Sequence, residues 1–308
     1  MVQARSFWTL ILLALHLQSM VLYLQAVTSQ PTPGLEQEFL LSLIISLLFL
    51  YLQAGGFIMT VLLPAKIVFA ERRLLFGGIM ALYAIGDLHL SLAKNKPMDI
   101  FGDVWQDHTE KLRAGFSTLK DEDVCVLCGD ISWGMGMDET LPDFKFIDAL
   151  PGRKIILKGN HDYWWNTVTK IKKFFADNGI RTVDILYNNF FEYGEYAICG
   201  TRGWFYEEEK GGEHDRKIMM REVMRLEASL KAAGERKKLV FLHYPPKYQF
   251  YTCPEIVELF KKYEVRLCCY GHIHGKGCRY ALNGWSGGTE YRLVSADNVM
   301  FAPVRLPY

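Results

Sequence analysis

Histidine, aspartate and asparagine recur in short motifs that each follow an apolar run of the chain. Five of the eight histidines lie in these motifs. Carboxylate and amide oxygens combined with imidazole nitrogens suit divalent Mn, Fe or Zn. If the motifs meet in space, they would form a metal site. They are Gly86-Asp87-Leu88-His89, Gly129-Asp130, Gly159-Asn160-His161-Asp162, His243 and Gly271-His272-Ile273-His274.

Each motif taken alone also has an ordinary structural explanation. Asp-x-His occurs freely in proteins, and Gly-Asp is a common turn. His243 is followed by Tyr244-Pro245-Pro246, which fits a strand stopped by proline. Gly-Asn-His-Asp and Gly-His-Ile-His are more specific. The complete series, in this order and always after an apolar run, makes coincidence a poor explanation.

The motifs can meet in space only if the strands that precede them end at a common edge of a sheet. From Met80 onward, short β-rich runs alternate with amphipathic helical patterns, which indicates an α/β architecture. In open α/β sheets, ligands bind at the carboxyl ends of the strands. The predicted strands are Leu82–Ile85, Val124–Leu127, Lys154–Leu157, Thr182–Leu186, Tyr196–Cys199, Leu239–Leu242 and Arg266–Tyr270, with a closing pair near Arg279–Leu282 and Tyr291–Ser295.

Three helices are expected between these strands. Asp215–Ala233 carries apolar residues at spacings of four, three and four, which places them on one helical face. Thr167–Asn178 is followed by Gly179, a typical helix stop, and Pro254 begins a helix that runs to about Tyr263.

The motif series resembles the calcineurin-like metallophosphoesterase superfamily, whose pattern is D-x-H, G-D, G-N-H-[DE], H and G-H-x-H. The resemblance spans Asp87 to His274. It implies a four-layer αββα sandwich, with two mixed sheets flanked by helices. It also implies a hydrolase acting on phosphoric ester bonds, either a phosphatase or a phosphodiesterase, with a dinuclear centre of two divalent metal ions.

The same resemblance implies roles for individual residues. A metal-bound hydroxide would attack phosphorus, and His161 would act as general acid towards the leaving group. Independently of the resemblance, the adjacency of Asp162 to His161 predicts that Asp162 orients the imidazole and favours its protonated form. The resemblance implies one metal held by Asp87, His89 and His274, a second held by Asn160, His243 and His272, and Asp130 bridging the two.

Three features lie outside this pattern. Many members carry Asp or Asn three positions after Gly-Asp, where this chain has Trp133. The side chains that hold Asp130 in place and contact the substrate beside it are therefore not predicted. Arg202 follows a predicted strand and is a candidate contact for a phosphate oxygen, with a surface arginine as an equal alternative. Cys125 and Cys128 flank an apolar strand without a second pair, which favours buried thiols over a zinc site.

Composition excludes several other classes of function. From Met80 onward the chain has 31 basic and 31 acidic residues, which gives no support to an extended nucleic-acid surface. The odd count of seven cysteines does not suggest a disulfide framework and favours a reducing compartment.

Residues 1–79 differ from the rest because they hold only seven charged side chains. Two apolar stretches, 7–27 and 39–65, flank a polar turn, and roughly 20 apolar residues suffice to cross a bilayer. Basic residues lie before the first stretch and after the second, and this distribution of charge predicts a hydrophobic helical hairpin with both ends cytoplasmic. Residues 80–308 would then be a catalytic domain held at the membrane and facing the cytoplasm.

Two alternatives to this anchor remain. A secretory signal peptide lacks a convincing cleavage site. Translation from Met80, whose sequence MALYAIGDLHLS resembles a normal start into a first strand, would instead give a cytoplasmic, soluble protein.

Other functions remain to be weighed against a hydrolase. A non-catalytic scaffold that keeps the fold is one alternative, but such a scaffold would be expected to lose ligands or the acid histidine, and none is missing. A zinc peptidase lacks its H-E-x-x-H helix. A phosphate-ester substrate is expected, whereas its identity and the oligomeric state are not predicted.

Overall fold

The computed structural model describes residues 80–94, 96–204 and 212–308. These residues belong to one compact unit, Gly78–Tyr308. The predicted N-terminal hairpin lies outside them. Within the described part of the chain, every helix is too short or too polar to cross a membrane.

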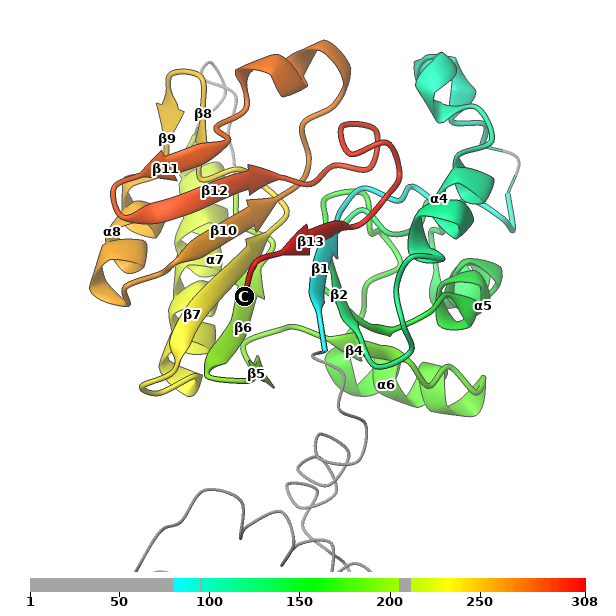
Figure 1. Cartoon of the computed structure of the whole chain (residues 1–308), viewed down its shortest axis with the longest axis horizontal. Coiled ribbons are helices and arrows are strands. Elements are labelled where there is room, and N and C mark those ends of the chain that lie inside the picture. Colours follow the sequence, from blue (N-terminus) through cyan, green and yellow to red (C-terminus); the bar gives the residue numbers. More distant parts are fainter. Residues whose placement is uncertain (1–79, 95, 205–211) are drawn as a thin grey trace, which may run out of the picture. The chain divides into compact units, whose positions relative to one another are not determined.

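Five strands form the first sheet, in the order β13-β1-β2-β3-β4 (Figure 1). The strands from β1 to β4 run parallel to their neighbours, whereas β13 runs antiparallel to β1, so the sheet is mixed. The strands are β1 (Leu82–Ile85), β2 (Val124–Leu127), β3 (Arg153–Ile156), β4 (Val183–Ile185) and β13 (Val304–Leu306).

Six strands form the second sheet, in the order β11-β12-β10-β7-β6-β5. Its central strands are parallel, and β5 and β11 pair antiparallel at its two edges. The strands are β5 (Phe190–Tyr193), β6 (Tyr196–Thr201), β7 (Lys237–Leu242), β10 (Leu267–Tyr270), β11 (Gly284–Ser286) and β12 (Thr289–Leu293), and β8 (Lys247–Tyr248) with β9 (Tyr251–Thr252) form a separate hairpin.

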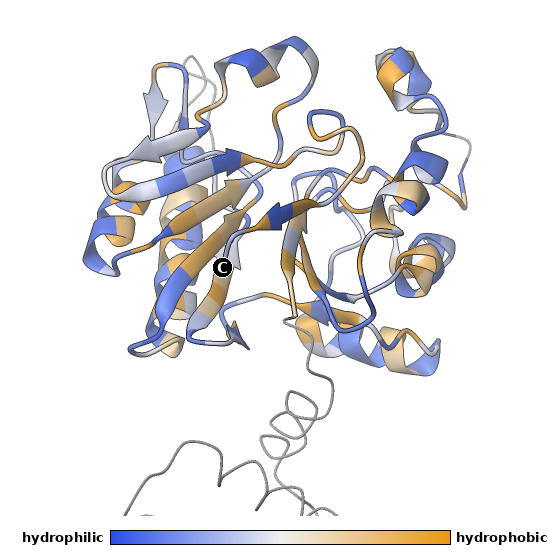
Figure 2. Cartoon of the chain, viewed as in Figure 1, coloured by the Kyte–Doolittle hydropathy of each residue, from blue (hydrophilic) through white to orange (hydrophobic). Residues whose placement is uncertain are grey.

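Three hydrophobic cores hold the sheets and helices together. One joins the two sheets, with Val126 and Ile155 from the first and Phe241 from the second among its buried residues. The others lie under helices on each sheet, and Figure 2 shows β10 as largely hydrophobic. The α-helices are α4 (His108–Phe116), α5 (Leu141–Ala149) and α6 (Val168–Asp177) beside the first sheet, and α7 (Glu213–Ala232) and α8 (Pro254–Lys262) beside the second.

Four short 3-10 helices complete the described elements, and all lie in loops. They are η1 (Asp99–Phe101), η2 (Asp103–Trp105), η3 (Met137–Thr140) and η4 (Gly275–Tyr280).

Strand register brings the carboxyl ends of neighbouring strands level with one another. Ile85 at the end of β1 pairs with Leu127 at the end of β2, and Tyr270 of β10 pairs with Leu242 of β7. Just beyond β1, Gly86 forms a parallel bridge with Ser295, which follows β12 of the other sheet. This bridge ties together the ends of the two sheets, and the residues that follow the strands meet there.

The predicted mixed α/β fold with two large sheets is confirmed, and most strand bounds agree within two residues. The strand predicted near Arg279–Leu282 is wrong, because η4 occupies Gly275–Tyr280. The edge partner of β12 is instead β11, whose pairing passes through the Gly287-Gly288 turn.

Candidate metal centre

The residues predicted to bind metal all follow strands whose carboxyl ends meet where the two sheets are joined. Three of these strands are parallel neighbours in the first sheet, and two are parallel neighbours in the second. Asp87 and His89 follow β1, Asp130 follows β2, Asn160 follows β3, His243 follows β7, and His272 and His274 follow β10.

Asp87, His89 and His274 form one group with metal-ligand geometry. One potential ligand atom from each lies within 4.8 Å of the others. Asp87 also belongs to a second such group, with Asp130 and His243. The three residues predicted for the first metal therefore lie together, and the carboxylates of Asp87 and Asp130 connect them to His243 of the second predicted set.

The amide oxygen of Asn160 joins the residues predicted for the second metal. It lies 2.6 Å from Nε2 of His243 and 2.9 Å from Nδ1 of His272. Asp130 lies between the two predicted sets, because its Oδ1 is 3.6 Å from His243 Nε2 and its Oδ2 is 3.8 Å from His89 Nε2.

Four of these residues have left-handed backbone conformations. Their φ angles are 59° for Asp87, 47° for His89, 51° for Asp130 and 71° for His272. Positive φ is uncommon for residues other than glycine, and such conformations cluster at functional sites. The fold therefore sustains backbone strain at the point where the polar side chains converge.

Two glycines leave room for the carboxylates. A Cβ atom at Gly159 would overlap Oδ1 of Asp130, and one at Gly271 would overlap Oδ2 of Asp87. Any larger residue at these positions would displace the carboxylates. The glycines at these two positions thus allow the carboxylates to approach the backbone closely, in addition to forming turns.

Hydrogen bonds on the far side of two imidazoles fix which nitrogen faces the cluster. Nδ1 of His243 donates to the carbonyl of Cys128 at 3.0 Å, which leaves Nε2 directed at Asn160. Nδ1 of His274 bonds to Oδ1 of Asp297 at 2.9 Å, and its Nε2 lies 3.5 Å from Asp87. Metal-binding histidines are commonly oriented by such partners.

Asp297 was not singled out from the sequence. It carries no recognisable motif and lies four residues beyond the end of β12. The rule that identified the other residues, a polar side chain shortly after an apolar strand, would also have pointed to it.

Asp297→Asn is expected to weaken metal binding about 10–100-fold, the usual cost of losing a residue that orients a ligand. The physical reason is that His274 loses the carboxylate that fixes its ring. Metal affinity measured by titration of the chelated protein tests this. Asp177→Asn, on the exposed face of α6, is the matched control. Equal affinity in both variants would show that His274 does not depend on Asp297.

The electrostatics of the cluster fit divalent cations. Burial, together with the charges of Asp162 and Asp87, raises the pKa of Asp130 well above its usual value. A bound cation would stabilise the ionised form of Asp130. Burial lowers the pKa of His243, and burial together with the repulsion that a protonated His243 would exert lowers the pKa of His272 to about 3, which favours neutral rings with lone pairs for a metal.

His161 lies at the rim of the cluster, next to Asn160 in the chain. Its backbone amide donates to Oδ1 of Asp130 at 2.8 Å, and its Nδ1 lies 3.3 Å from the hydroxyl of Tyr163. Its ring centroid lies 5.8 Å from that of His89. Burial and the charge of His243 lower its pKa to about 4. The imidazole is thus within reach of a group bound at the cluster.

Asp162 has different partners from the predicted one. Its buried carboxylate accepts hydrogen bonds from the amides of Gly159 at 2.7 Å, Asp130 at 3.0 Å and Ile131 at 2.9 Å, and from Nε1 of Trp164 at 3.0 Å. These bonds fasten the loop after β2 to the loop after β3. Asp162 therefore holds the backbone of Asp130 in place.

Trp133 stacks against the cluster. Its ring lies 4.9 Å from that of His89 at an interplanar angle of 21°, and 4.5 Å from that of His161. Nζ of Lys96 lies 3.0 Å from the centroid of its ring. The residue that replaces the more common Asp or Asn thus supports His89 by aromatic packing and positions a cation near His161.

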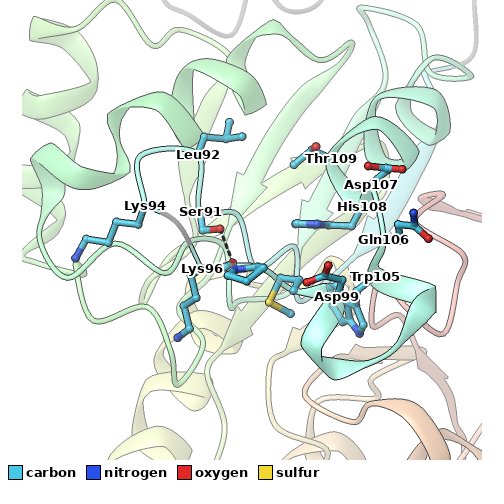
Figure 3. A pocket seen from close by; sticks show the side chains of 12 residues that line it. Ser91, Leu92, Lys94, Lys96, Asp99, Trp105, Gln106, Asp107, His108 and Thr109 are labelled. Carbon is cyan, nitrogen blue, oxygen red and sulfur yellow. Dashed lines mark hydrogen bonds between the residues drawn. The ribbon is translucent and has the colours of Figure 1, made fainter.

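A pocket of about 380 Å³ lies beside the cluster. Its wall includes Trp105, whose ring is 5.7 Å from those of both His89 and His274. Figure 3 shows the imidazole of His108 extending into the pocket, with Lys96 on the opposite side. Both signs of charge line the pocket, so it can hold a polar part of a ligand.

Two further predicted features are not among the residues of the cluster itself. Arg202 follows β6, and its Nη2 lies 3.4 Å from Glu222 of α7. Cys125 and Cys128 are buried, free thiols, and burial raises the pKa of both.

Comparison with solved structures gives similar chains of low sequence identity. One is a protein of unknown function, AQ665, from Aquifex aeolicus, with 18% identity over 73% of this chain and 95% of that chain, at a TM-score of 0.42. Another is the phosphopantetheinyl hydrolase of Mycobacterium tuberculosis, with 15% identity over 71% and 90% of the two chains, at a TM-score of 0.47. A third, TT1561 of Thermus thermophilus, has 13% identity over 70% and 89%, at 0.44.

No curated protein matches the chain. A family model described as calcineurin-like phosphoesterase matches residues 80–276, which is more than half of the chain and includes every motif of the cluster. The chain therefore belongs to the calcineurin-like phosphoesterase family.

Proposed function

We propose that residues 80–308 are the catalytic domain of a phosphoester hydrolase that works with two divalent metal ions. The observation that carries this proposal is the position of Asp130, whose two carboxylate oxygens face His89 on one side and His243 on the other. In this proposal one ion is held by Asp87, His89 and His274, the other by Asn160, His243 and His272, and Asp130 is shared.

The ions, when bound, would polarise a phosphoryl group and acidify an attacking water. Other side chains of the protein hold the predicted metal ligands in position. Trp133 and Asp297 hold His89 and His274 in position. Asp162 holds the Asp130 loop against the loop that carries Asn160. The result is a preorganised site whose geometry does not have to form during the reaction.

His161 is the proposed general acid towards the leaving oxygen. Its ring lies at the rim of the cluster and is partly exposed, so it is free to face the substrate. Its pKa of about 4 is low for this role. A negatively charged phosphate group beside the ring would raise that pKa, because a nearby opposite charge favours the protonated form.

A panel of aryl phosphate monoesters and diesters, assayed with and without added Mn, tests the proposal. Metal-dependent hydrolysis of either class is expected, and the ratio of the two rates identifies the preferred class. The competing function is a binding scaffold with the same fold. That function would be favoured if the metal-loaded protein hydrolysed none of the esters.

For residues 1–79 we propose a role in location only, as a membrane anchor that leaves the catalytic domain in the cytoplasm. The support for an anchor is the pair of apolar stretches, 7–27 and 39–65, with basic residues at both outer ends, and every residue of the cluster lies after Met80. Fractionation of cells that express the full chain tests this. Full-length protein in membranes is expected, and a soluble product that begins at Met80 would contradict it.

A further inference from the structure

The end of β6 carries two buried hydrogen-bond donors that lack partners among the described residues. They are Nε of Arg202 and Nε1 of Trp204. The two side chains lie together, with the guanidinium carbon of Arg202 4.9 Å from the ring centroid of Trp204. Buried donors are rarely left unpaired, so these two groups call for an acceptor that the described residues do not supply.

Among the described residues, several positively charged side chains gather at the same place. Glu222 of α7 is 1% exposed, and its Oε1 is shared between Arg225 Nη1 at 2.5 Å and Arg202 Nη2 at 3.4 Å. Its Oε2 accepts a hydrogen bond from Thr201 at 2.6 Å. One carboxylate thus contacts two guanidinium groups. Arg202 lies at the longer distance and therefore forms the weaker interaction with Glu222. Lys158, just before Gly159, adds a third positive charge that Arg202 and Arg225 repel.

This cluster of cations adjoins the metal centre. The carbonyl of Arg202 accepts hydrogen bonds from the amides of His243 at 3.1 Å and Tyr244 at 2.9 Å. The ring of Tyr244 lies 4.3 Å from that of His272 and 5.4 Å from that of Trp204. A single aromatic side chain therefore separates the unpaired donors from a predicted metal ligand.

We infer that Arg202, Trp204 and Arg225 form a subsite for a second anionic group on the substrate, beside the phosphoryl group at the metal centre. This inference rests on the proposed function. Guanidinium groups bind carboxylate and phosphate oxygens with paired, charge-assisted hydrogen bonds, and the indole N–H adds a donor. The preferred substrates are phosphoesters with a second phosphate or carboxylate group.

Non-hydrolysable ligands test the subsite without requiring turnover. The probes are ω-carboxyalkylphosphonates of graded chain length and alkylphosphonates of the same lengths, titrated calorimetrically into the Mn-loaded full chain. At one length the carboxylate is expected to tighten binding at least about tenfold, because hydrogen bonds to charged groups are the strong ones. Arg202→Gln and Arg225→Gln should remove most of this advantage, and Trp204→Phe part of it.

The matched control is Arg221→Gln, which removes an exposed arginine from α7 one position before Glu222. It should keep the advantage of the carboxylate. Equal binding of the two ligand series at every length would overturn the subsite, as would a loss in Arg221→Gln equal to that in Arg225→Gln. Hydrolysis of p-nitrophenyl phosphate by the same wild-type preparation is read separately. Absence of hydrolysis of both this monoester and its diester, bis(p-nitrophenyl) phosphate, overturns the proposed function, whereas hydrolysis of either without a carboxylate advantage overturns only the subsite.

Discussion

Asp130→Asn is expected to abolish tight metal binding and, with it, metal-dependent hydrolysis. Its carboxylate faces His89 and His243 at once, so its loss affects both predicted metals. The loss of activity should exceed the about 10–100-fold that removal of a supporting residue such as Asp297 costs. Metal content after dialysis and kcat/KM with aryl phosphates measure the two effects.

Although Asp130→Asn is expected to impair metal binding and activity, it is expected to preserve or raise the stability of the metal-free protein. Burial and the charges of Asp162 and Asp87 raise the pKa of Asp130, so its ionised form costs stability near neutral pH. A neutral asparagine removes that cost. Without metal, the Tm of Asp130→Asn should therefore equal or exceed that of wild type. Added Mn should raise the Tm of wild type alone.

Asp138→Asn, which changes an exposed aspartate in η3, is the control and should behave as wild type. Full metal binding by Asp130→Asn would contradict the bridging position. A metal-free Tm well below that of wild type would instead indicate that the carboxylate stabilises the fold.

His161→Ala is expected to keep its metals but lose about 10²–10⁴-fold of kcat/KM on alkyl phosphates, the range typical of general acid catalysis. Activity on p-nitrophenyl esters should fall much less, because that leaving group needs little protonation. The imidazole ring of His161 adjoins the cluster, so its removal affects protonation of the leaving group. The backbone amide of His161 remains after the substitution and still donates to Asp130, so the metals are retained.

His214→Ala, an exposed histidine in the first turn of α7, controls for loss of a histidine as such. An equal loss on alkyl and aryl esters in His161→Ala would refute the role as acid. In that case the imidazole would be assigned to substrate binding.

The sequence predicted those features that depend on local signals. An apolar run followed by a polar side chain, with a glycine before that side chain in every case but β7, identified the ends of β1, β2, β3, β7 and β10, and hence the residues that meet there. The bounds of β1 and β2 were predicted to the residue, because each is a short, largely buried apolar run that ends within two residues of a Gly-Asp pair.

Features that depend on contacts between distant segments were not predicted. Adjacency in sequence suggested that Asp162 orients His161, but the carboxylate points to the loop after β2 and caps its amides. Asp297 reaches His274 only because β12 lies beside β10. The strand expected near Arg279–Leu282 is absent because η4 occupies Gly275–Tyr280, where the left-handed backbone of Gly275, with φ of 54°, turns the chain out of an extended conformation.

The most direct test of the account is to strip the full chain of metal with a chelator and return Mn in measured steps, following bound metal and ester hydrolysis together. The account predicts that activity is absent without metal and reaches its maximum near two bound ions per chain. Hydrolysis that survives complete removal of metal, or a protein that binds no metal and hydrolyses no ester, would contradict it.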